Sequence, residues 1–483
     1  MRPIPRTLLA PLLASGVLLV SGCATVGPDY HGAPKVADTA ATRGSFLRAD
    51  AGTSTAEPTA RWWQALGDPV LDQVIETALT NAPDVQAANA RIAQARAGLE
   101  VNKTALLPTA SVSFAVPYVN LPGSILGNSG REEFHAYAPG FDTSWEIDLF
   151  GGTRRKIEAA SARAEAAEAG LADARVTLSA EIARAYVSLR AKQAVLALTD
   201  RQAAIDSDLV SLARQRLAGG TAPEQPLAQA RAQLAQTEAD RAKTRADIVV
   251  LIDQIAVLAG REPGALDTLL SAPNAVPLPP ADVAVGDPAL LLRNRPDIRM
   301  AERQLAAANA DIGARVADNY PKISFTGLLG TGGQNFADVF KTSSLIGLAL
   351  PQIKWSLFDG GRVNAQIRSA KGAYAEAEAQ FRSTVLKALQ DAENSLTRFG
   401  GQRIAYGKAL DSQAQAARAH ALQVQRVQGG TAPRSDALTA ERQAVQAEMA
   451  AISARAELTT DFVAVEKALG LGWTAQTTEE APK

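Results

Sequence analysis

A five-residue stretch occurs twice in this chain without any change, as Gly219-Gly220-Thr221-Ala222-Pro223 and as Gly429-Gly430-Thr431-Ala432-Pro433. The two copies lie 210 residues apart (429 − 219). Paired glycines supply the left-handed backbone that ends a helix, and Thr with a nearby Pro is typical of the start of the next helix. Each copy therefore predicts the turn of a helical hairpin. The repetition predicts that the chain contains two copies of one unit.

Other positions match at nearly the same offset. Asn294-Arg295-Pro296-Asp297 corresponds to Asn81-Ala82-Pro83-Asp84, and Trp355, Gly361 and Gly470 correspond to Trp145, Gly151 and Gly260. Each unit has the pattern helix, strand, strand, long helix, turn, helix. We predict a first repeat at 61–260 with strands at about 109–116 and 135–145, and a second at 289–472 with strands at about 322–329 and 344–350. A proline-rich linker at 261–288 joins them, and 473–483 is expected to be a disordered tail.

The predicted long helix runs from about 153 to 217 without a breaker of consequence. At about 1.5 Å per residue it would be on the order of 100 Å long. Its apolar positions alternate spacings of three and four, which is a coiled-coil heptad pattern rich in Ala. The shorter helices at 83–106 and 224–259 could stack end to end beside it. One chain would then supply four helical columns and four strands.

Four strands cannot close a barrel, and an open sheet edge is not tolerated in lipid. Each predicted strand is nevertheless long enough to cross a bilayer when tilted. Closure therefore requires several chains. Two chains would give eight strands and a plugged bore, and three would give twelve strands and a water-filled passage. Trp145 and Trp355, at the ends of strands, fit either an aromatic girdle at the membrane interface or packing between sheet and helices.

The start of the chain predicts a lipoprotein. Residues 1–22 combine Arg2 and Arg6 with an apolar run that is too short to cross a membrane as a helix, so we expect a signal peptide. Cys23 follows Val20-Ser21-Gly22, which resembles a bacterial lipobox, and we expect Cys23 to carry lipid. Residues 23–60 are expected to be a lipid-anchored tether without a core of its own.

Composition excludes several classes of function. Lys and Arg number 49 against 50 Asp and Glu, so the net charge of −1 gives no basic excess for nucleic acid. The three His residues do not have metal-ligand spacing, and the single Cys cannot form an internal disulfide. We find no nucleophile elbow, phosphate-binding loop or paired acid–base motif. We expect no enzymatic activity, no metal and no cofactor.

The two turns differ in the residues on their C-terminal side. Glu224 lies three residues after Thr221 and predicts a capping box, whereas the second copy has Arg434 at that position. Asp436 occupies the position that Pro226 has in the first copy. We therefore expect the first hairpin to be the better capped and the second to be the more mobile.

Several motifs together resemble the outer-membrane factor family, the relatives of TolC, and in particular its NodT-type efflux lipoproteins. The motifs are Val26-Gly27-Pro28-Asp29-Tyr30 close behind Cys23, the stretch from Trp62 to Asp84, the segments Trp145–Gly151 and Trp355–Gly361, and both Gly-Thr turns. The resemblance covers nearly all of the mature chain. It implies a mainly α fold with a membrane β-barrel: a homotrimer with a twelve-stranded outer-membrane barrel continued by a long periplasmic α-helical barrel.

The resemblance also implies partners and roles for the turns. The channel would be the exit duct of a tripartite efflux pump, with a periplasmic adaptor (membrane fusion) protein and an inner-membrane transporter of the resistance-nodulation-division type. The hairpin tips at 219–223 and 429–433 would meet the adaptor and close the periplasmic entrance. Asp436 matches a position of a constricting acidic ring, which Arg434 could join across chains, although Thr439 stands where relatives can carry a further Asp.

Two alternatives remain open at the level of the sequence. One is the outer-membrane exit duct of a type I secretion system. The other is a structural periplasmic lipoprotein rod, which would explain the lipobox and the heptads but not the strand pairs in both repeats.

Overall fold

The computed structural model of the protein describes residues 25–50, 52–122 and 131–473. Its chain divides into two units, and each takes segments from both halves of the sequence. The first unit comprises the start of the chain up to Pro34 together with Arg91–Ala167 and Met300–Phe381, and the second comprises Lys35–Ala90, Glu168–Arg299 and the chain from Arg382 onward. Cys23, the predicted signal peptide and the predicted tail beyond residue 473 lie outside the described residues.

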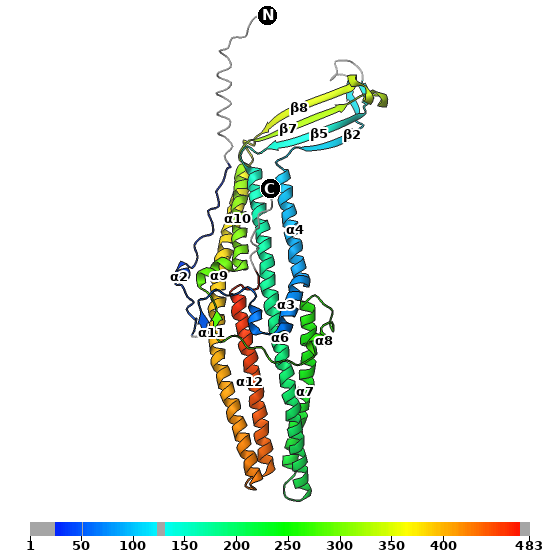
Figure 1. Ribbon diagram of the computed structural model, residues 1–483. Helices are drawn as coiled ribbons and strands as arrows, with labels where there is room; N and C mark the ends of the chain where they lie inside the picture. The colour runs from blue at the N-terminus through cyan, green and yellow to red at the C-terminus, as the bar shows by residue number, and fades with distance from the viewer. Residues whose placement is uncertain (1–24, 51, 123–130, 474–483) are drawn as a thin grey trace. The chain divides into compact units, whose positions relative to one another are not determined.

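The first unit contains a four-stranded antiparallel sheet in the order β2-β5-β7-β8, whose strands lie side by side in Figure 1. β2 is Thr109–Ala115, β5 is Ala138–Ile147, β7 is Lys322–Thr331 and β8 is Leu345–Lys354. The sheet therefore joins one strand pair from each half of the chain through the β5–β7 pairing. β2 and β8 are its open edges.

One prediction in this region is wrong. The second strand of the first repeat, predicted at about 135–145, overlaps a different element, because β3 (Tyr118–Pro122) and β4 (Arg131–His135) pair as a separate two-stranded sheet. His135 therefore ends β4 rather than starting the next strand, which begins at Ala138. Pro117 and Pro122 weaken the strand pattern of this stretch, although Pro is compatible with the end of an edge strand.

Helices make up most of the chain. α3 (Pro69–Asn81) and α4 (Pro83–Thr104) precede the strands of the first half, and α6 (Gly152–Ala218) and α7 (Gln225–Leu258) follow them. α9 (Pro288–Asn294), α10 (Pro296–Ala317), α11 (Arg362–Gln428) and α12 (Arg434–Ala468) repeat the pattern in the second half. Among the described residues, no helix combines the length and the apolar character that a membrane span needs.

Local signals explain where these helices begin. Asp68 caps α3 by accepting the N–H groups of Val70 and Leu71, and Pro69 occupies its first position. α4, which follows α3, and α10, which follows α9, both begin at a Pro. The residue before a Pro is disfavoured in helical geometry, so the preceding helix ends there. Ala82 and Arg295, which precede these prolines, are both extended.

The core of the second unit surrounds Trp62 and Trp63, which lie in the 3-10 helix η2 (Trp62–Leu66) and are each 2% exposed. Trp62 packs edge-on against Trp63 and against Phe462 of α12. Tyr186 of α6 donates its hydroxyl to Asp68 (2.6 Å), so the cap of α3 is also tied to the long helix. This core joins residues from both halves of the chain.

The predicted tether and linker are not free segments. Phe46 is 4% exposed, and the amides of Leu47 and Arg48 donate to the carboxylate of Glu393 (both 2.9 Å). β1 (Thr53–Ser54) from the tether pairs in parallel with β6 (Val283–Ala284) from the linker, which also contains α8 (Asp267–Leu270). The short helix α2 (Asp38–Ala41) lies within the predicted tether. The Ala-, Gly- and Pro-rich composition of the tether does not predict these contacts, because they depend on helices that are distant in the sequence.

Candidate functional site

The two repeated turns have the same backbone structure. Gly220 and Gly430 have φ values of 68° and 70°, the left-handed conformation that glycine adopts without strain. Thr221 donates its N–H to the carbonyl of Arg216 (2.9 Å), and Thr431 donates to that of Arg426 (2.9 Å). The N–H of the glycine before each Thr donates to the carbonyl of the residue three positions earlier, Leu217 or Val427 (both 3.0 Å). Both turns are therefore Schellman motifs that end α6 and α11.

The predicted capping box is wrong. The hydroxyl of Thr221 donates to the carbonyl of Arg216 (3.0 Å) instead of accepting a bond from the next helix. Glu224 immediately precedes α7 with helical backbone angles and makes no side-chain cap. Thr431 donates in the same way to Arg426 (3.1 Å). Each Thr hydroxyl therefore bonds to a carbonyl of the preceding helix and not to an N–H group of the next helix. Capping by Thr is the same in both hairpins and gives no reason for them to differ in mobility.

The difference between the turns lies in the first residues of the second helix. α12 begins at Arg434, and Pro433 has an extended backbone before it. Asp436 is exposed, donates its N–H to the carbonyl of Pro433 (3.0 Å) and accepts the hydroxyl of Ser435 (3.2 Å). A carboxylate in the first turn of a helix is favoured by the helix dipole. Within this chain Asp436 and Arg434 are not paired with each other.

Arg434 instead contacts the first hairpin. Its Nη2 lies 3.4 Å from Oδ2 of Asp208 on α6, and Arg216 on α6 donates to the hydroxyl of Ser435 (3.5 Å). Both side chains of the ion pair are more than half exposed, so the pair contributes at most about 1 kcal/mol. These contacts bring the start of α12 against the end of α6.

Apolar packing secures the same contact further from the turns. Ile205 of α6 packs with Leu438 and Val445 of α12, and Leu198, Leu209 and Met449 surround them. Burying side chains of this size contributes about 1.5–3 kcal/mol each. Packing therefore outweighs the exposed ion pair in holding the two hairpins together within one chain.

A buried carboxylate lies inside this contact. Asp206 is 1% exposed and accepts the hydroxyl of Thr237 on α7 (2.7 Å). Its other oxygen has no hydrogen bond in the part of the chain that the structure describes, and the nearest cation is Arg442 of α12 at 3.9 Å. Arg201 nearby binds Glu441 of α12 (2.9 Å). Sequence reasoning missed these residues, although a carboxylate at 206 between the apolar residues 205 and 209 was a usable signal.

The junction between strands and long helices shows a second repeated device. Trp145 donates its indole N–H to the carbonyl of Leu106 (2.9 Å), and Trp355 donates to that of Asn319 (3.0 Å). The bonds tie the C-terminal ends of β5 and β8 to the residues that follow α4 and α10. Trp145 is 37% and Trp355 55% exposed, so neither is a core residue of the single chain.

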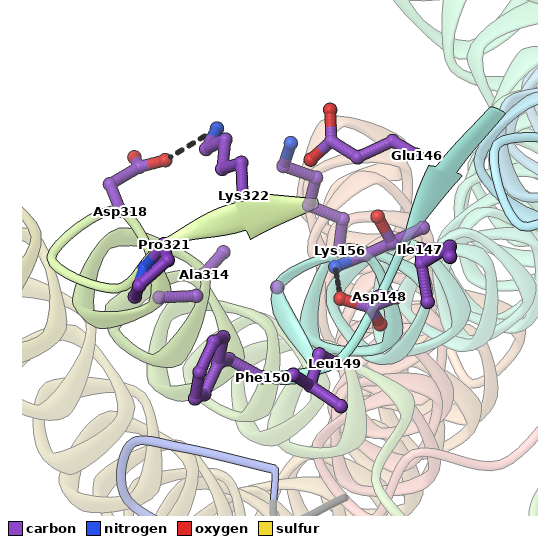
Figure 2. Close-up of a pocket in the computed structure, with 13 residues that line it drawn as sticks. Glu146, Ile147, Asp148, Leu149, Phe150, Lys156, Ala314, Asp318, Pro321 and Lys322 are labelled. Atoms are coloured by element: carbon purple, nitrogen blue, oxygen red, sulfur yellow. Dashed lines mark hydrogen bonds and ion pairs between the residues drawn. The ribbon is translucent and has the colours of Figure 1, made fainter. Parts of the chain in front are cut away.

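Figure 2 shows a small pocket of about 40 Å³ at this junction, between the end of β5 and the start of β7. Asp148 accepts the N–H groups of Thr153 and Arg154 (3.0 and 2.9 Å) and so caps α6. Asp318 pairs with Lys322 (3.0 Å) across its rim. The pocket is far smaller than the roughly 300–1,000 Å³ that small-molecule sites occupy.

A larger cavity of about 260 Å³ lies in the second unit, and half of its lining residues are charged, among them Asp173, Arg184, Arg295, Arg398 and Lys467. Arg295 is already held there by both carboxylate oxygens of Asp297 (2.9 and 2.7 Å). No group of three or more His, Cys, Asp or Glu side chains within the described ranges could hold a metal ion. The features that repeat in both halves are the two Schellman turns and the indole hydrogen bonds of Trp145 and Trp355.

Comparison with known proteins agrees with this picture. The family model described as "Outer membrane efflux protein" matches residues 74–261 and 288–471. Nodulation protein T of Rhizobium leguminosarum bv. trifolii is 29% identical over 386 residues, covering 78% of this chain and 79% of that protein. The toluene efflux pump outer membrane protein TtgF of Pseudomonas putida is 27% identical over 463 residues, covering 94% and 95%.

The solved structure of the outer-membrane channel OprN superposes with a TM-score of 0.84 and 31% identity, covering 93% of this chain and all of that one. The long helices and the small sheet are thus the fold of a known outer-membrane channel. The chain belongs to the outer membrane efflux protein family, and it is an outer-membrane channel of the efflux type rather than an enzyme.

Proposed function

We propose that three copies of this chain form a passive exit duct for small molecules, with a twelve-stranded barrel in the outer membrane and a helical barrel in the periplasm. The observation that carries the proposal is the sheet β2-β5-β7-β8, which is open at both edges. Unpaired edges in lipid leave backbone groups unsatisfied at a cost of several kcal/mol each. Pairing β8 of one copy with β2 of the next would remove every edge, and three copies would supply twelve strands.

The two faces of the sheet support insertion into a bilayer. Residues paired in register share a face, and successive residues alternate between faces. One face carries apolar rows: Ile147-Ile323-Ile353, Trp145-Phe325-Pro351 and Val112-Phe141-Leu329. The other face carries rows that mix polar and apolar members: Glu146-Ser324-Gln352, Thr109-Ser144-Thr326-Leu350 and Ser111-Asp142-Leu328-Leu348. The apolar face suits lipid, and the mixed face suits a water-filled bore.

Exposure points the same way. On the apolar face Val112 is 78%, Leu329 57% and Ile353 74% exposed in the single chain. Side chains of this kind are rarely left in water as a continuous patch. In the proposed barrel they would face lipid, with Trp145 and Trp355 at the interface as an aromatic girdle.

We propose that the hairpin tips at 219–223 and 429–433 form the periplasmic entrance and contact an adaptor protein. Asp436 would then occur three times around one axis, where clustered carboxylates favour cations. Arg434 is held at 3.4 Å from Asp208 of its own chain and would restrain the start of α12 in the closed state. Opening would require α12 to separate from α6 at the packed cluster around Ile205 and Leu438.

Family membership supports a proposal for the remaining parts of the pump. We propose a periplasmic adaptor of the membrane fusion type and an inner-membrane transporter of the resistance-nodulation-division type as partners, with lipid attached at Cys23. Residues 61–260 and 289–472 would be the two repeats of the channel, joined by 261–288. The toluene pump to which TtgF belongs suggests small organic molecules as cargo.

The experiment is planar-bilayer recording of the purified chain together with complementation of a strain that lacks its efflux channel. We expect ion conduction and restored tolerance of small toxic compounds. A chain that fails to conduct and restores no tolerance would contradict the duct. Restored secretion of a protein, without restored tolerance of small compounds, would identify a type I secretion duct instead.

A further inference from the structure

The charged cavity of about 260 Å³ in the second unit lies on the side of its helices that faces away from the tether and the linker. On α11 the cavity is lined by Asp391, Ser395 and Arg398, whose spacings of four and three place them on one face of the helix. Glu393 accepts two amides of the tether (both 2.9 Å) and lies two positions after Asp391, which is the opposite face. α11 therefore separates the cavity from the tether.

α12 and α6 have the same orientation. The residues of α12 that line the cavity are Ala464, Lys467 and Ala468. Thr459, on the other side of α12, donates its hydroxyl to the linker carbonyl of Pro277 (2.7 Å). On α6, Arg184 lines the cavity, whereas Gln193 on the opposite face donates to the linker carbonyl of Leu270 (2.7 Å). All three helices thus contact the tether or the linker on one side and line the cavity on the other.

The basic groups that line the cavity outnumber its carboxylates by four to three. Arg295 binds two of the carboxylates, since it donates to both oxygens of Asp297 (2.9 and 2.7 Å) and lies 3.9 Å from Asp391. The other basic side chains make no hydrogen bond or ion pair within the ranges that the structure describes, and they are Arg184, Arg398 and Lys467. The cavity therefore combines a net positive charge with three unused groups of donors.

The cavity is partly shielded from water and is partly apolar. Burial is the largest cause that raises the pKa of Asp173, the remaining carboxylate. Burial also raises the pKa of Asp461, which lies outside the lining and within reach of the charges of Arg398 and Arg184. Ionic contacts are stronger in such surroundings than at an open surface. The apolar residues of the lining are Val176, Pro296, Ala464 and Ala468.

The duplication of the chain does not produce a second set of these basic groups. Ser188 and Val257 occupy the positions 210 residues before Arg398 and Lys467. The cavity with its unpaired donors is therefore a property of the second half, and it would occur once in each chain and three times in the proposed channel.

We propose that this cavity binds the carboxylate group of small organic acids on the wall of the bore. The inference rests on the proposed duct, in which the tether leads to lipid outside the barrel and the cavity side of the helices faces the bore. A planar guanidinium matches a carboxylate with two parallel hydrogen bonds, so Arg184 and Arg398 hold the charged end of the acid and Lys467 adds a further donor. Val176 and the two alanines contact its apolar part. The volume of about 260 Å³ lies just below the roughly 300–1,000 Å³ of small-molecule sites, which suits a small acid.

The test measures binding of para-fluorobenzoate to the purified full-length protein by fluorine NMR. The amide para-fluorobenzamide is the uncharged probe of similar shape, and inorganic phosphate is the anion without an apolar part. Arg398→Gln and Arg184→Gln each remove one guanidinium from the cavity, and both residues are exposed, so folding does not depend on either. Arg418→Gln removes the same charge from an exposed position of α11 outside the lining and is the matched control.

We expect saturable binding of fluorobenzoate to the parent and to Arg418→Gln. Binding should be about tenfold weaker in Arg398→Gln and in Arg184→Gln, because a hydrogen bond from a charged group contributes about that much. Equal affinity in the parent and in both cavity variants would overturn the site, and so would binding of the amide as tight as that of the acid. Phosphate that binds as tightly as fluorobenzoate would overturn the assignment to organic acids.

Planar-bilayer recording tests the place of the site in the bore. We expect fluorobenzoate to reduce the single-channel current of the parent more than that of Arg398→Gln. Binding with no effect on the current of a conducting channel would overturn the placement on the bore wall. A protein that binds fluorobenzoate through Arg398 but conducts no ions would instead contradict the proposed duct and leave the carboxylate site in place.

Discussion

The two halves of the chain share their backbone devices but not their buried charges. Both end the long helix in a Schellman turn, and both tie a strand-end Trp to the helix before the first strand. Both cap the long helix with an Asp, since Asp148 and Asp359 each accept two backbone N–H groups. The buried Arg155, Arg190 and Asp206 of α6 have no counterparts in α11, where Ala365, Gly400 and Ala416 occupy the positions 210 residues on.

The contrast between shared backbone features and unshared buried charges indicates which parts of a duplicated unit can diverge. The turns, the Asp caps and the Trp hydrogen bonds each pair a backbone N–H or carbonyl group, and every copy of the unit has the same backbone groups. The same residue types can therefore fulfil this role in both halves. The buried charges of α6 also use partners outside that helix, in the tether, the linker and α12. At the same positions α11 has uncharged small residues. Variants of both kinds can test whether the shared devices are equivalent and whether the unshared charges are not.

The largest effect is expected from Arg190, which is 1% exposed and donates to Gln193 (2.8 Å) and to the linker carbonyls of Leu270 and Ala272 (3.3 and 2.7 Å). Arg190→Ala should cost more than about 3 kcal/mol, since hydrogen bonds from charged groups contribute about 1.5–3 kcal/mol each. Thermal unfolding followed by circular dichroism measures this. The exposed Arg398→Ala is the control, and equal losses in both would contradict the special role of Arg190.

The next largest effect on stability is expected from Glu466. This buried charge belongs to the second half only, because Ala256 occupies the corresponding position in the first half. It is 4% exposed, and burial raises its pKa from 4.5 to about 8. Its folded state therefore holds the proton more tightly than its unfolded state, so stability falls as pH rises from about 4.5 to about 8 and is constant above. Glu466→Gln should remove this slope.

The expected gain from Glu466→Gln at pH 8 is on the order of a few kcal/mol, since a tenfold change in proton affinity corresponds to about 1.4 kcal/mol. At pH 4 the variant and the parent should unfold at the same temperature. Unfolding temperatures measured across this range decide the matter. A parallel pH profile in parent and variant would show that Glu466 does not titrate as described.

The shared turns should respond alike. Gly220→Ala and Gly430→Ala each force a side chain into left-handed backbone, at a cost of about 1–2 kcal/mol. Hydrogen exchange of the amides in the two turns measures the local loss. We expect the two values to agree closely, because the hydrogen bonds around both glycines match to within 0.1 Å. A much larger loss at one turn would break the equivalence.

The strand-end staples should also respond alike, with a smaller effect. Trp145→Phe and Trp355→Phe keep an aromatic ring but remove the bonds to Leu106 and Asn319, for a loss of about 0.5–1.5 kcal/mol each. The temperature at which purified oligomers dissociate on a gel is the readout. An unchanged temperature in both variants would mean that the indole N–H groups do not stabilise the junction.

The smallest effect on stability is expected at the unshared tip residues. Arg434→Gln breaks the exposed pair with Asp208 and should cost no more than about 1 kcal/mol. It should nevertheless raise the open probability of the channel, because α12 loses a restraint to α6. Single-channel recording compares it with Asp436→Asn, which should lower cation selectivity without opening the channel. The opposite assignment of the two effects would contradict the proposed gate.

Sequence patterns predicted the local and periodic features of the fold. The heptads and glycines predicted helices at about 153–217 and 224–259, and the structure has Gly152–Ala218 and Gln225–Leu258. Patterns failed where distant segments supply the surface. The docking of residues 25–60 depends on Arg155, Glu393 and other groups more than 100 residues away. The prediction of a capping box was wrong because Thr221 lies between two helices and its hydroxyl can bond to either. The sequence alone does not indicate that it bonds to α6.

In the proposed channel, the open sheets of three chains close into one barrel. Native mass spectrometry of the full-length protein, extracted in detergent from outer membranes, tests it directly. We expect a single assembly of three chains, each carrying acyl groups. An assembly of two chains would give eight strands and a filled barrel, and a stable monomer would leave β2 and β8 unpaired. Either of those results would contradict the account.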